Sequence, residues 1–325
     1  MPRAPRHWNR PPGLTAALLA PLGWLYGIGT ARRIAKGPRE RLGIPIICVG
    51  NLTAGGTGKT PTVMALADRL SDHGAQILSR GYGGALTGPV QVDAARHSAA
   101  DVGDEPLLLS AFAPVWVAKD RHAGALAARD AGAKVLILDD GFQDARLAYD
   151  LSIVVVDAGR GFGNGRIIPA GPLREPVMRG LARADAILSI GSEAAQSRFA
   201  ERYRAALPIP HLTGSLDTLP TGLPLSGAPV VAVAGIGDPE KFFATVRGTG
   251  AKIVQSIALA DHQELSRPLM TRLLRDATEA GAILLTTEKD AVRLPREFRA
   301  SVTTLPVRLS FDDPAKLQTL LARLL

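Results

Sequence analysis

The chain has 325 residues, 46% of them apolar, which allows one large or two ordinary domains with a sizeable core. Cys48 is the one cysteine, which excludes a disulfide framework and cysteine-ligated zinc and favours a reducing compartment. Residues 1–41 hold eight Lys or Arg and one Glu, whereas the rest of the chain is nearly neutral, with 30 basic and 29 acidic residues. A basic N-terminus on a near-neutral body predicts a partner that is an anionic membrane surface, and neither nucleic acid nor an obligate protein partner is indicated.

The first predicted element is the apolar stretch from Leu14 to Ile28, which has basic residues on both sides. It contains Pro21 and is shorter than the roughly 20 residues that a spanning helix needs. Trp8, Trp24 and Tyr26 lie in or near it, and such rings favour the headgroup level of a bilayer. We therefore expect residues 1–41 to be a membrane-associating segment, peripheral or monotopic. A cleaved signal peptide and a plain core helix are the alternatives.

A phosphate-binding loop is predicted next. Ile46 to Val49 is a short apolar run typical of a buried strand, and Gly58-Lys59-Thr60 matches the end of the motif Gly-x-x-x-x-Gly-Lys-Ser/Thr. Thr53 stands at the first glycine position of the motif, and Gly55 and Gly56 lie inside the loop. We expect the backbone of Thr53, Ala54, Gly55, Gly56, Thr57, Gly58, Lys59 and Thr60 to cradle phosphates. The Lys59 ammonium would reach the β- and γ-phosphates, and the Thr60 hydroxyl would bind Mg²⁺.

Two glycine-containing loops follow. After a predicted strand at 75–79, Arg80 begins a glycine-rich turn in which it either contacts phosphate or stays a solvated loop residue. Asp104 lies in the segment Asp101-Val-Gly-Asp-Glu-Pro106, whose acids are typical of a helix N-terminus and are explained equally well by capping.

An apolar strand at 135–138 runs directly into Asp139 and Asp140. An acid at the end of such a strand, downstream of a phosphate loop, is the usual second metal-binding element of nucleotide enzymes, although a surface turn is the alternative. We therefore expect Asp139 or Asp140 to bind Mg²⁺.

The rest of the chain predicts further α/β structure. A strand at 151–157 precedes a long Gly-, Pro- and Arg-rich loop, and residues 208–229 are predicted to be a linker. Strands and helices then alternate, which predicts a parallel sheet covered on both faces. The predicted fold class is α/β: a P-loop kinase domain at 42–210 with a parallel sheet, a smaller C-terminal α/β domain at 211–325, and an N-terminal membrane-associated helix.

Together these segments resemble the tetraacyldisaccharide 4'-kinase (lipid A 4'-kinase) family over nearly the whole chain. The resemblance rests on ordered motifs: Val49-Gly-Asn-Leu-Thr53, Gly55-Gly-Thr-Gly-Lys-Thr-Pro61, Ser79-Arg-Gly-Tyr82, Gly103-Asp-Glu-Pro106, Asp139-Asp-Gly-Phe-Gln143, Pro169-Ala-Gly-Pro-Leu-Arg-Glu175, Asp261-His262 and Thr287-Glu-Lys-Asp-Ala291. The family pattern usually continues after Asp-His with a second histidine and an aromatic residue, whereas Gln263 and Leu265 stand here.

The resemblance implies transfer of the ATP γ-phosphate to the 4'-hydroxyl of a tetraacylated glucosamine disaccharide 1-phosphate, with Mg²⁺, at the cytoplasmic face of the bacterial inner membrane. It makes Asp104 the proton acceptor, supported by His262, with Lys59 as the third catalytic residue. It adds Glu175 to the metal-binding candidates Thr60, Asp139 and Asp140. The alternatives are a membrane-associated P-loop ATPase switch that acts on protein partners, and a scaffold with a degenerate site.

Overall fold

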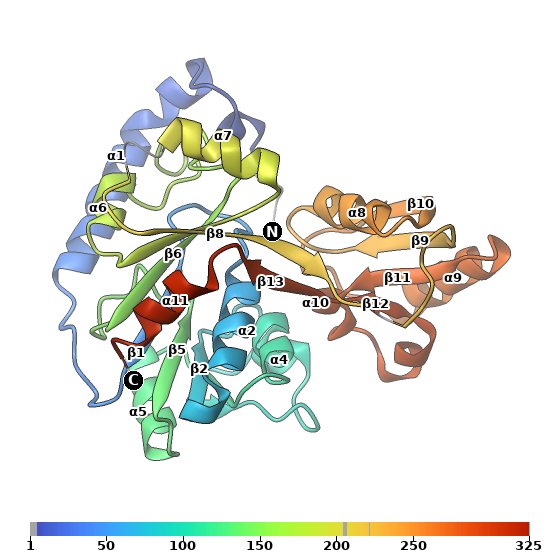
Figure 1. The fold of residues 1–325 in the computed structure, drawn as a ribbon, viewed down its shortest axis with the longest axis horizontal. Helices are drawn as coiled ribbons and strands as arrows, with labels where there is room; N and C mark the ends of the chain where they lie inside the picture. The colour runs from blue at the N-terminus through green and yellow to red at the C-terminus, as the bar shows by residue number, and fades with distance from the viewer. Residues whose placement is uncertain (1–4, 204–206, 221, 325) are drawn as a thin grey trace.

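The computed structural model describes residues 5–203, 207–220 and 222–324. Arg3 of the basic segment 1–41 and Leu325 lie outside these ranges. Within them, the chain forms a large unit around a nine-stranded sheet and a small unit around a four-stranded sheet. Figure 1 shows the two units side by side, joined by two segments of chain.

The large sheet is parallel except at its two edges. Its strands follow the order β13 (Val307–Phe311), β8 (His211–Thr218), β7 (Ala186–Ile190), β6 (Leu151–Asp157), β1 (Ile46–Gly50), β5 (Val135–Asp139), β2 (Ala75–Ser79), β4 (Val115–Val117) and β3 (Val90–Gln91). The edge strands β13 and β3 pair antiparallel with their neighbours. The central strands β1, β5, β6 and β7 are buried along their whole length, as their continuous apolar sequences require.

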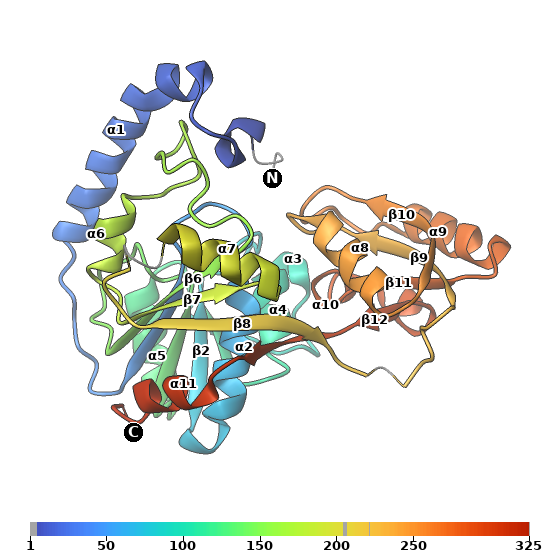
Figure 2. The ribbon, with the colours of Figure 1, turned by 45° about the horizontal axis from the view of Figure 1, so that its top comes forward.

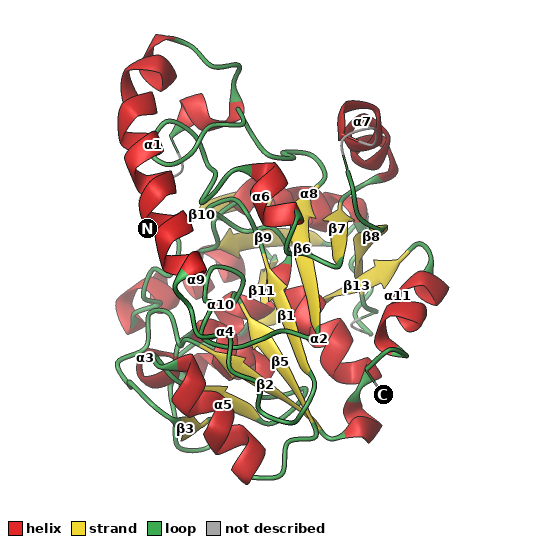
Figure 3. Cartoon of the chain, turned by 90° about the vertical axis from the view of Figure 1, so that its left-hand side faces the viewer, coloured by secondary structure: helices red, strands yellow, loops and turns green. Residues whose placement is uncertain are grey.

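Helices cover both faces of this sheet (Figure 3). On one face, α2 (Lys59–Arg69), α4 (Asp104–Leu109) and α11 (Pro314–Leu321) share a core with the strands. On the other face lie α5 (Arg121–Asp130), α6 (Val177–Leu181) and α7 (Glu193–Tyr203). Shorter helices are η1 (Arg6–Asn9), η2 (Ser71–His73) and α3 (Ala99–Val102). The predicted parallel sheet with two covered faces is confirmed.

The small unit is a second, fully parallel α/β sheet. Its strand order is β10 (Lys252–Ala258), β9 (Pro229–Ala234), β11 (Ile283–Thr287) and β12 (Thr303–Leu305). Helix α8 (Pro239–Gly248) packs on one face and α9 (Arg267–Glu279) on the other. The short helices α10 (Glu288–Ala291) and η4 (Arg296–Ser301) follow β11.

The predicted boundary between the two domains, between residues 210 and 211, does not coincide with the boundary between the two sheets. β8 pairs parallel with β7, and β13 returns from the small unit to pair antiparallel with β8. Both strands therefore belong to the large sheet, and the predicted linker at 208–229 contains a strand. Because β8 is rich in Thr, Ser and Gly, its composition suggested a connection, whereas its backbone completes a sheet edge.

The N-terminal helix α1 (Leu14–Ala35) runs along the outside of the large unit (Figure 2). It continues through Pro21 and past Ile28, so it is longer than the apolar stretch predicted, and its length and composition are sufficient to cross a membrane. One side of α1 faces the protein. A β-carbon on Gly23 would lie 2.8 Å from the Ile167 carbonyl oxygen, and one on Gly27 would lie 2.9 Å from the Ile167 side chain. These two glycines, one helical turn apart, let α1 approach the 159–176 loop closely.

Candidate active site

The predicted phosphate loop connects β1 to α2 at the carboxyl edge of the large sheet. Inside the loop, the Asn51 amide donates to the Gly55 carbonyl (3.4 Å) and to the Thr57 hydroxyl (3.3 Å). From outside, the Pro172 carbonyl accepts the Ala54 N–H (2.8 Å). The loop is therefore braced on both sides, and the N-terminus of α2 presents its unpaired N–H groups and partial positive charge next to it.

Lys59, the first residue of α2, lies beside an ionised aspartate. Its Nζ is 3.8 Å from Asp140 Oδ1, and Arg174 donates to the two oxygens of the same carboxylate at 2.9 and 3.3 Å. Burial alone would raise the pKa of Asp140, but the charges of Lys59 and Arg174 outweigh burial and lower this pKa to about 2.

Asp139, the last residue of β5, has a different environment. Its Oδ2 accepts from the Ser79 hydroxyl (3.2 Å), whereas its Oδ1 is buried and accepts no hydrogen bond from the described residues. Burial, with a smaller contribution from the charge of Glu105, raises the pKa of Asp139 to about 7, although Lys59 acts in the opposite direction. The pKa values of these two neighbouring aspartates are thus shifted in opposite directions from the ordinary value.

Glu175 is engaged elsewhere. Its two oxygens accept from Arg183 at 2.7 and 2.6 Å, and Gln143 also donates to Oε1 (3.1 Å). The described part of the chain holds no group of three or more Asp, Glu, His or Cys side chains arranged to bind a metal. Glu175 is nevertheless linked to Asp140 through Gln143, whose Oε1 accepts from Arg174 (3.0 Å), the partner of Asp140.

Thr60 and Arg80, the other residues predicted to bind ATP or Mg²⁺, lie at the ends of secondary-structure elements. Thr60 occupies the first turn of α2, directly after Lys59. Arg80 follows β2, is exposed, and forms no ion pair or side-chain hydrogen bond with residues that the structure describes.

Asp104 begins α4 and meets residues of the small unit. Gly103 precedes it with a φ of 94°, and a β-carbon there would lie 2.6 Å from the Tyr82 carbonyl oxygen, so this turn requires glycine. The Asp104 Oδ2 lies 2.8 Å from His262 Nδ1 and 3.1 Å from Arg293 Nε. Its Oδ1 accepts no hydrogen bond from any described residue. The nearby Asp101 caps α3 in a capping box with Ser98, so capping explains that acid but not Asp104.

His262 is held in an uncommon backbone conformation. Its φ is 60°, in the left-handed region, and its N–H donates to the Gly235 carbonyl (3.2 Å). Strained backbone of this kind persists where the surrounding structure fixes it, and it concentrates at functional sites. The predicted contact between Asp104 and His262 is therefore present across the junction between the two units.

A second set of ion pairs crosses the same junction. Arg160, in the loop after β6, lies 2.6 Å from Asp238, and Lys241 of α8 pairs with Asp157 at the end of β6. Because β6 is the neighbour of β1 in the sheet, these pairs lie on the strand next to the one that leads into the phosphate loop.

Comparisons with known proteins identify the family. The family model described as Tetraacyldisaccharide-1-P 4'-kinase matches residues 15–325. The chain belongs to the tetraacyldisaccharide 4'-kinase family. The family and the kinase activity predicted from the sequence are thereby confirmed.

Relatives in this family cover almost the whole chain. The tetraacyldisaccharide 4'-kinase of Jannaschia sp. is 62% identical over 96% of this chain and 95% of its own length. That of Dinoroseobacter shibae is 59% identical over 97% and 95%. Among solved structures, the "apo" form of LpxK from Aquifex aeolicus in complex with ATP has a TM-score of 0.77 and 29% identity, covering 96% of this chain and 99% of that one. The predicted fold class is confirmed.

Several residues of this family member take part in the site although the sequence assigned them no role. Asn51 braces the phosphate loop, Arg174 pairs with Asp140, and Arg293 and Lys289 come from the small unit toward α4. Arg174 and Lys289 lie inside motifs of the resemblance, which is the signal that marks them. Arg293 lies outside every motif, and only the fold brings it to Asp104.

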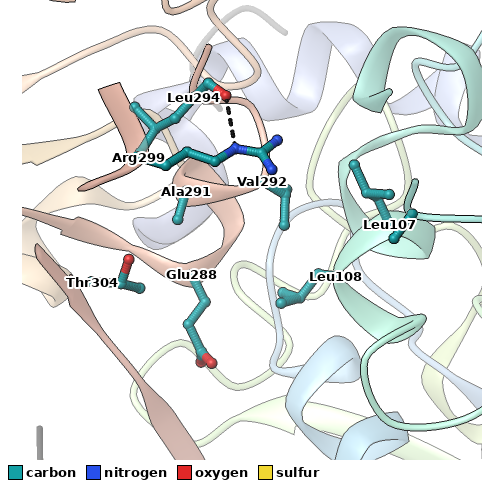
Figure 4. A pocket seen from close by; sticks show the side chains of 9 residues that line it. Leu107, Leu108, Glu288, Ala291, Val292, Leu294, Arg299 and Thr304 are labelled. Atoms are coloured by element: carbon teal, nitrogen blue, oxygen red, sulfur yellow. Dashed lines mark hydrogen bonds between the residues drawn. The ribbon is translucent and has the colours of Figure 1, made fainter. Parts of the chain in front are cut away.

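A cavity of about 380 Å³ lies in the junction on another side of α4 and α10. Figure 4 shows Leu107 and Leu108 on one wall and Glu288, Ala291, Val292 and Thr304 on the other. It includes neither the phosphate loop nor Asp104, so it is a packing gap between the units and not the predicted site.

Proposed function

We propose that this kinase transfers the γ-phosphate of ATP to the 4'-hydroxyl of a tetraacylated glucosamine disaccharide 1-phosphate, at the cytoplasmic face of the bacterial inner membrane. One observation carries the proposal: Asp104 of the large unit is hydrogen-bonded to His262 of the small unit while its Oδ1 stays available. A kinase acting on a sugar hydroxyl needs such a carboxylate near its phosphate loop, because the hydroxyl is a weak nucleophile until its proton is accepted.

The phosphate loop supplies the binding and the charge. The backbone N–H groups from Thr53 to Thr60 and the N-terminus of α2 bind the phosphates of ATP. The Lys59 ammonium turns from Asp140 to the transferring oxygens, where positive charge stabilises the transition state. Arg80 is exposed beside the loop after β2 and is a further cation for phosphate.

Asp104 accepts the proton. As the 4'-oxygen attacks the γ-phosphorus, its proton passes to Asp104 Oδ1, and the bond from the γ-phosphorus to the bridging oxygen of ADP breaks. The His262 Nδ1–H donates to Oδ2 and keeps the carboxylate turned toward the acceptor. His262 is thus an orienting group, and the proton ends on the carboxyl.

The residues at the end of β5 fit Mg²⁺. The buried Asp139 Oδ1 accepts no hydrogen bond from the described residues, and hard oxygen donors are the ligands that Mg²⁺ prefers. Asp139, with the Thr60 hydroxyl and with Asp140 through water, would hold the ion. When bound, Mg²⁺ supplies positive charge to the phosphates. Glu175, which is held by Arg183, stays a further candidate ligand of the ion.

The outer face of α1 is the membrane contact. Its apolar side chains are strongly exposed, with Leu14 at 85%, Leu18 at 80% and Trp24 at 66%. The opposite face packs against the 159–176 loop through Gly23 and Gly27, so the helix lies along the protein with only one side free. This arrangement supports a helix that lies in the membrane interface, with Arg32, Arg33 and Lys36 at its end for anionic headgroups.

The proposal is tested by following ATP consumption with and without the lipid acceptor in mixed micelles. We expect consumption to require the acceptor and to yield one phosphorylated lipid per ADP. ATP hydrolysis at the same rate without acceptor would instead identify a nucleotide switch.

A further inference from the structure

Lys289 lies next to the hydrogen-bonded pair formed by Asp104 and His262. Its Nζ is 2.9 Å from Glu105 Oε1 and 3.4 Å from His262 Nε2. Lys289 belongs to α10 of the small unit, whereas Glu105 follows Asp104 on α4 of the large unit. The four side chains therefore form a continuous chain of contacts across the junction: Asp104, His262, Lys289 and Glu105.

We propose that Lys289 is a positioning residue for the phosphoryl transfer, which holds His262 in the tautomer that donates from Nδ1 to Asp104. The inference rests on the proposed role of Asp104. An ammonium has only donors, so the ring nitrogen that faces it must carry a lone pair. His262 Nε2 is then the acceptor, and the ring proton must be on Nδ1, where Asp104 accepts it.

Lys289 is charged in this position. Burial disfavours its ammonium, but the charge of Glu105 and the hydrogen bond to it outweigh burial, with Asp261 and Asp104 adding to the effect, so its pKa is raised. It therefore faces the Nε2 of His262 as a hydrogen-bond donor.

Other charged groups also act on His262. The groups that face it or its partner are Asp104 and Glu105 on α4, Asp261 beside it, Lys289 on α10, and Arg293 after α10. The Tyr82 ring lies 5.9 Å away, centroid to centroid. Among these groups, Lys289 is the cation that lies against the ring itself.

The test is the steady-state kinetics, over a range of ATP and lipid concentrations, of Lys289→Met, Lys289→Arg and His262→Ala. Lys289→Met should lower kcat about 10-fold or more, with the KM for ATP unchanged. Lys289→Arg keeps a donor that faces Nε2 and should keep most of kcat. Adding Lys289→Met to His262→Ala should lower kcat little further, because Lys289 acts through the histidine.

Lys252→Met is the matched control, since Lys252 is an exposed lysine of the same unit. The thermal midpoint of each variant separates misfolding from a change in kcat. An unchanged kcat in a folded Lys289→Met variant would overturn the role of Lys289 while leaving the proposed function intact. If Asp104→Ala also kept full activity, the proposed proton acceptor itself would be wrong.

Discussion

The Lys59 ammonium lies 3.8 Å from the Asp140 carboxylate, so the lysine of the phosphate loop is paired with the acid that directly follows the adjacent strand β5. ATP phosphates would compete with Asp140 for this lysine. Lys59→Ala should lower kcat by about 10²-fold or more, roughly 3 kcal/mol, because the transition-state charge loses its main cation. Steady-state kinetics at saturating substrates measures this, and near-normal turnover would refute the assignment.

Replacing Asp139 or Asp140 by the neutral Asn should change the free energy of unfolding in opposite directions. The folded-state pKa of Asp139 is about 7, above the ordinary value of 3.8. Its stabilising contribution is therefore complete below pH 3.8 and is lost as the pH rises through 7. Asp139→Asn should raise the free energy of unfolding at pH 8, with a gain that grows by up to about 1.4 kcal/mol per pH unit between these values.

Asp140→Asn is the matched control at the next position. The Asp140 pKa is lowered to about 2, so its contribution is present above the unfolded value and is lost only as the pH falls toward 2. This variant should lower stability at pH 8. Urea unfolding of both variants between pH 5 and pH 8, with chelator and without ATP, compares them. Destabilisation by both at pH 8 would contradict the raised pKa of Asp139.

Asp104 and His262 should behave as one functional group. Asp104→Ala removes the proton acceptor and should lower kcat about 10²-fold or more, with little effect on ATP binding. His262→Ala should lower kcat too, and the double variant should fall little below Asp104→Ala, because the histidine acts through the carboxylate. The double-mutant cycle on kcat tests this. If the two substitutions lowered kcat by independent factors that multiply, His262 would act elsewhere, for example in binding the lipid headgroup.

The membrane contact should depend on the outer face of α1. Leu18→Glu combined with Leu22→Glu places charge on a strongly exposed apolar stripe and should reduce binding to anionic vesicles without loss of the fold. Binding of the unchanged protein should also weaken with salt, because exposed charges are screened over about 8 Å at physiological ionic strength. Val254→Glu, at an exposed valine of β10, is the control in a sedimentation assay. Equal partitioning of all three proteins would argue for a core helix.

Continuous apolar runs made much of the fold predictable. Strands such as β1 and β6 are buried on both faces, so each residue is apolar and the segment is evident without its neighbours. β8 was missed because its exposure alternates and its residues include Thr, Ser and Gly. Its place in the large sheet depends on β13, nearly 100 residues later, and no local pattern encodes that pairing.

The residues of the site likewise include some that a local motif predicts and some that only the fold brings together. Lys59 and Thr60 belong to a local motif whose geometry the backbone dictates, and they lie where the motif predicts. The partners of Glu175 and Asp104 were not predictable, because the fold decides which guanidinium lies near each acid. Arg183 neutralises Glu175, whereas Arg293 reaches Asp104 from the other unit.

The return of the chain to the large sheet has a consequence for how the protein is made. β13 and α11 leave the ribosome after every other element of the large unit, and Leu317 and Leu320 of α11 share a core with Val63 of the phosphate-loop helix. Until they emerge, β8 remains an unpaired sheet edge, and this side of α2 lacks its cover. The nucleotide-binding unit therefore cannot mature until the whole small unit has been made, even though its motif emerges early. A chain that stops before residue 307 should be aggregation-prone and handed to chaperones despite containing every predicted catalytic residue.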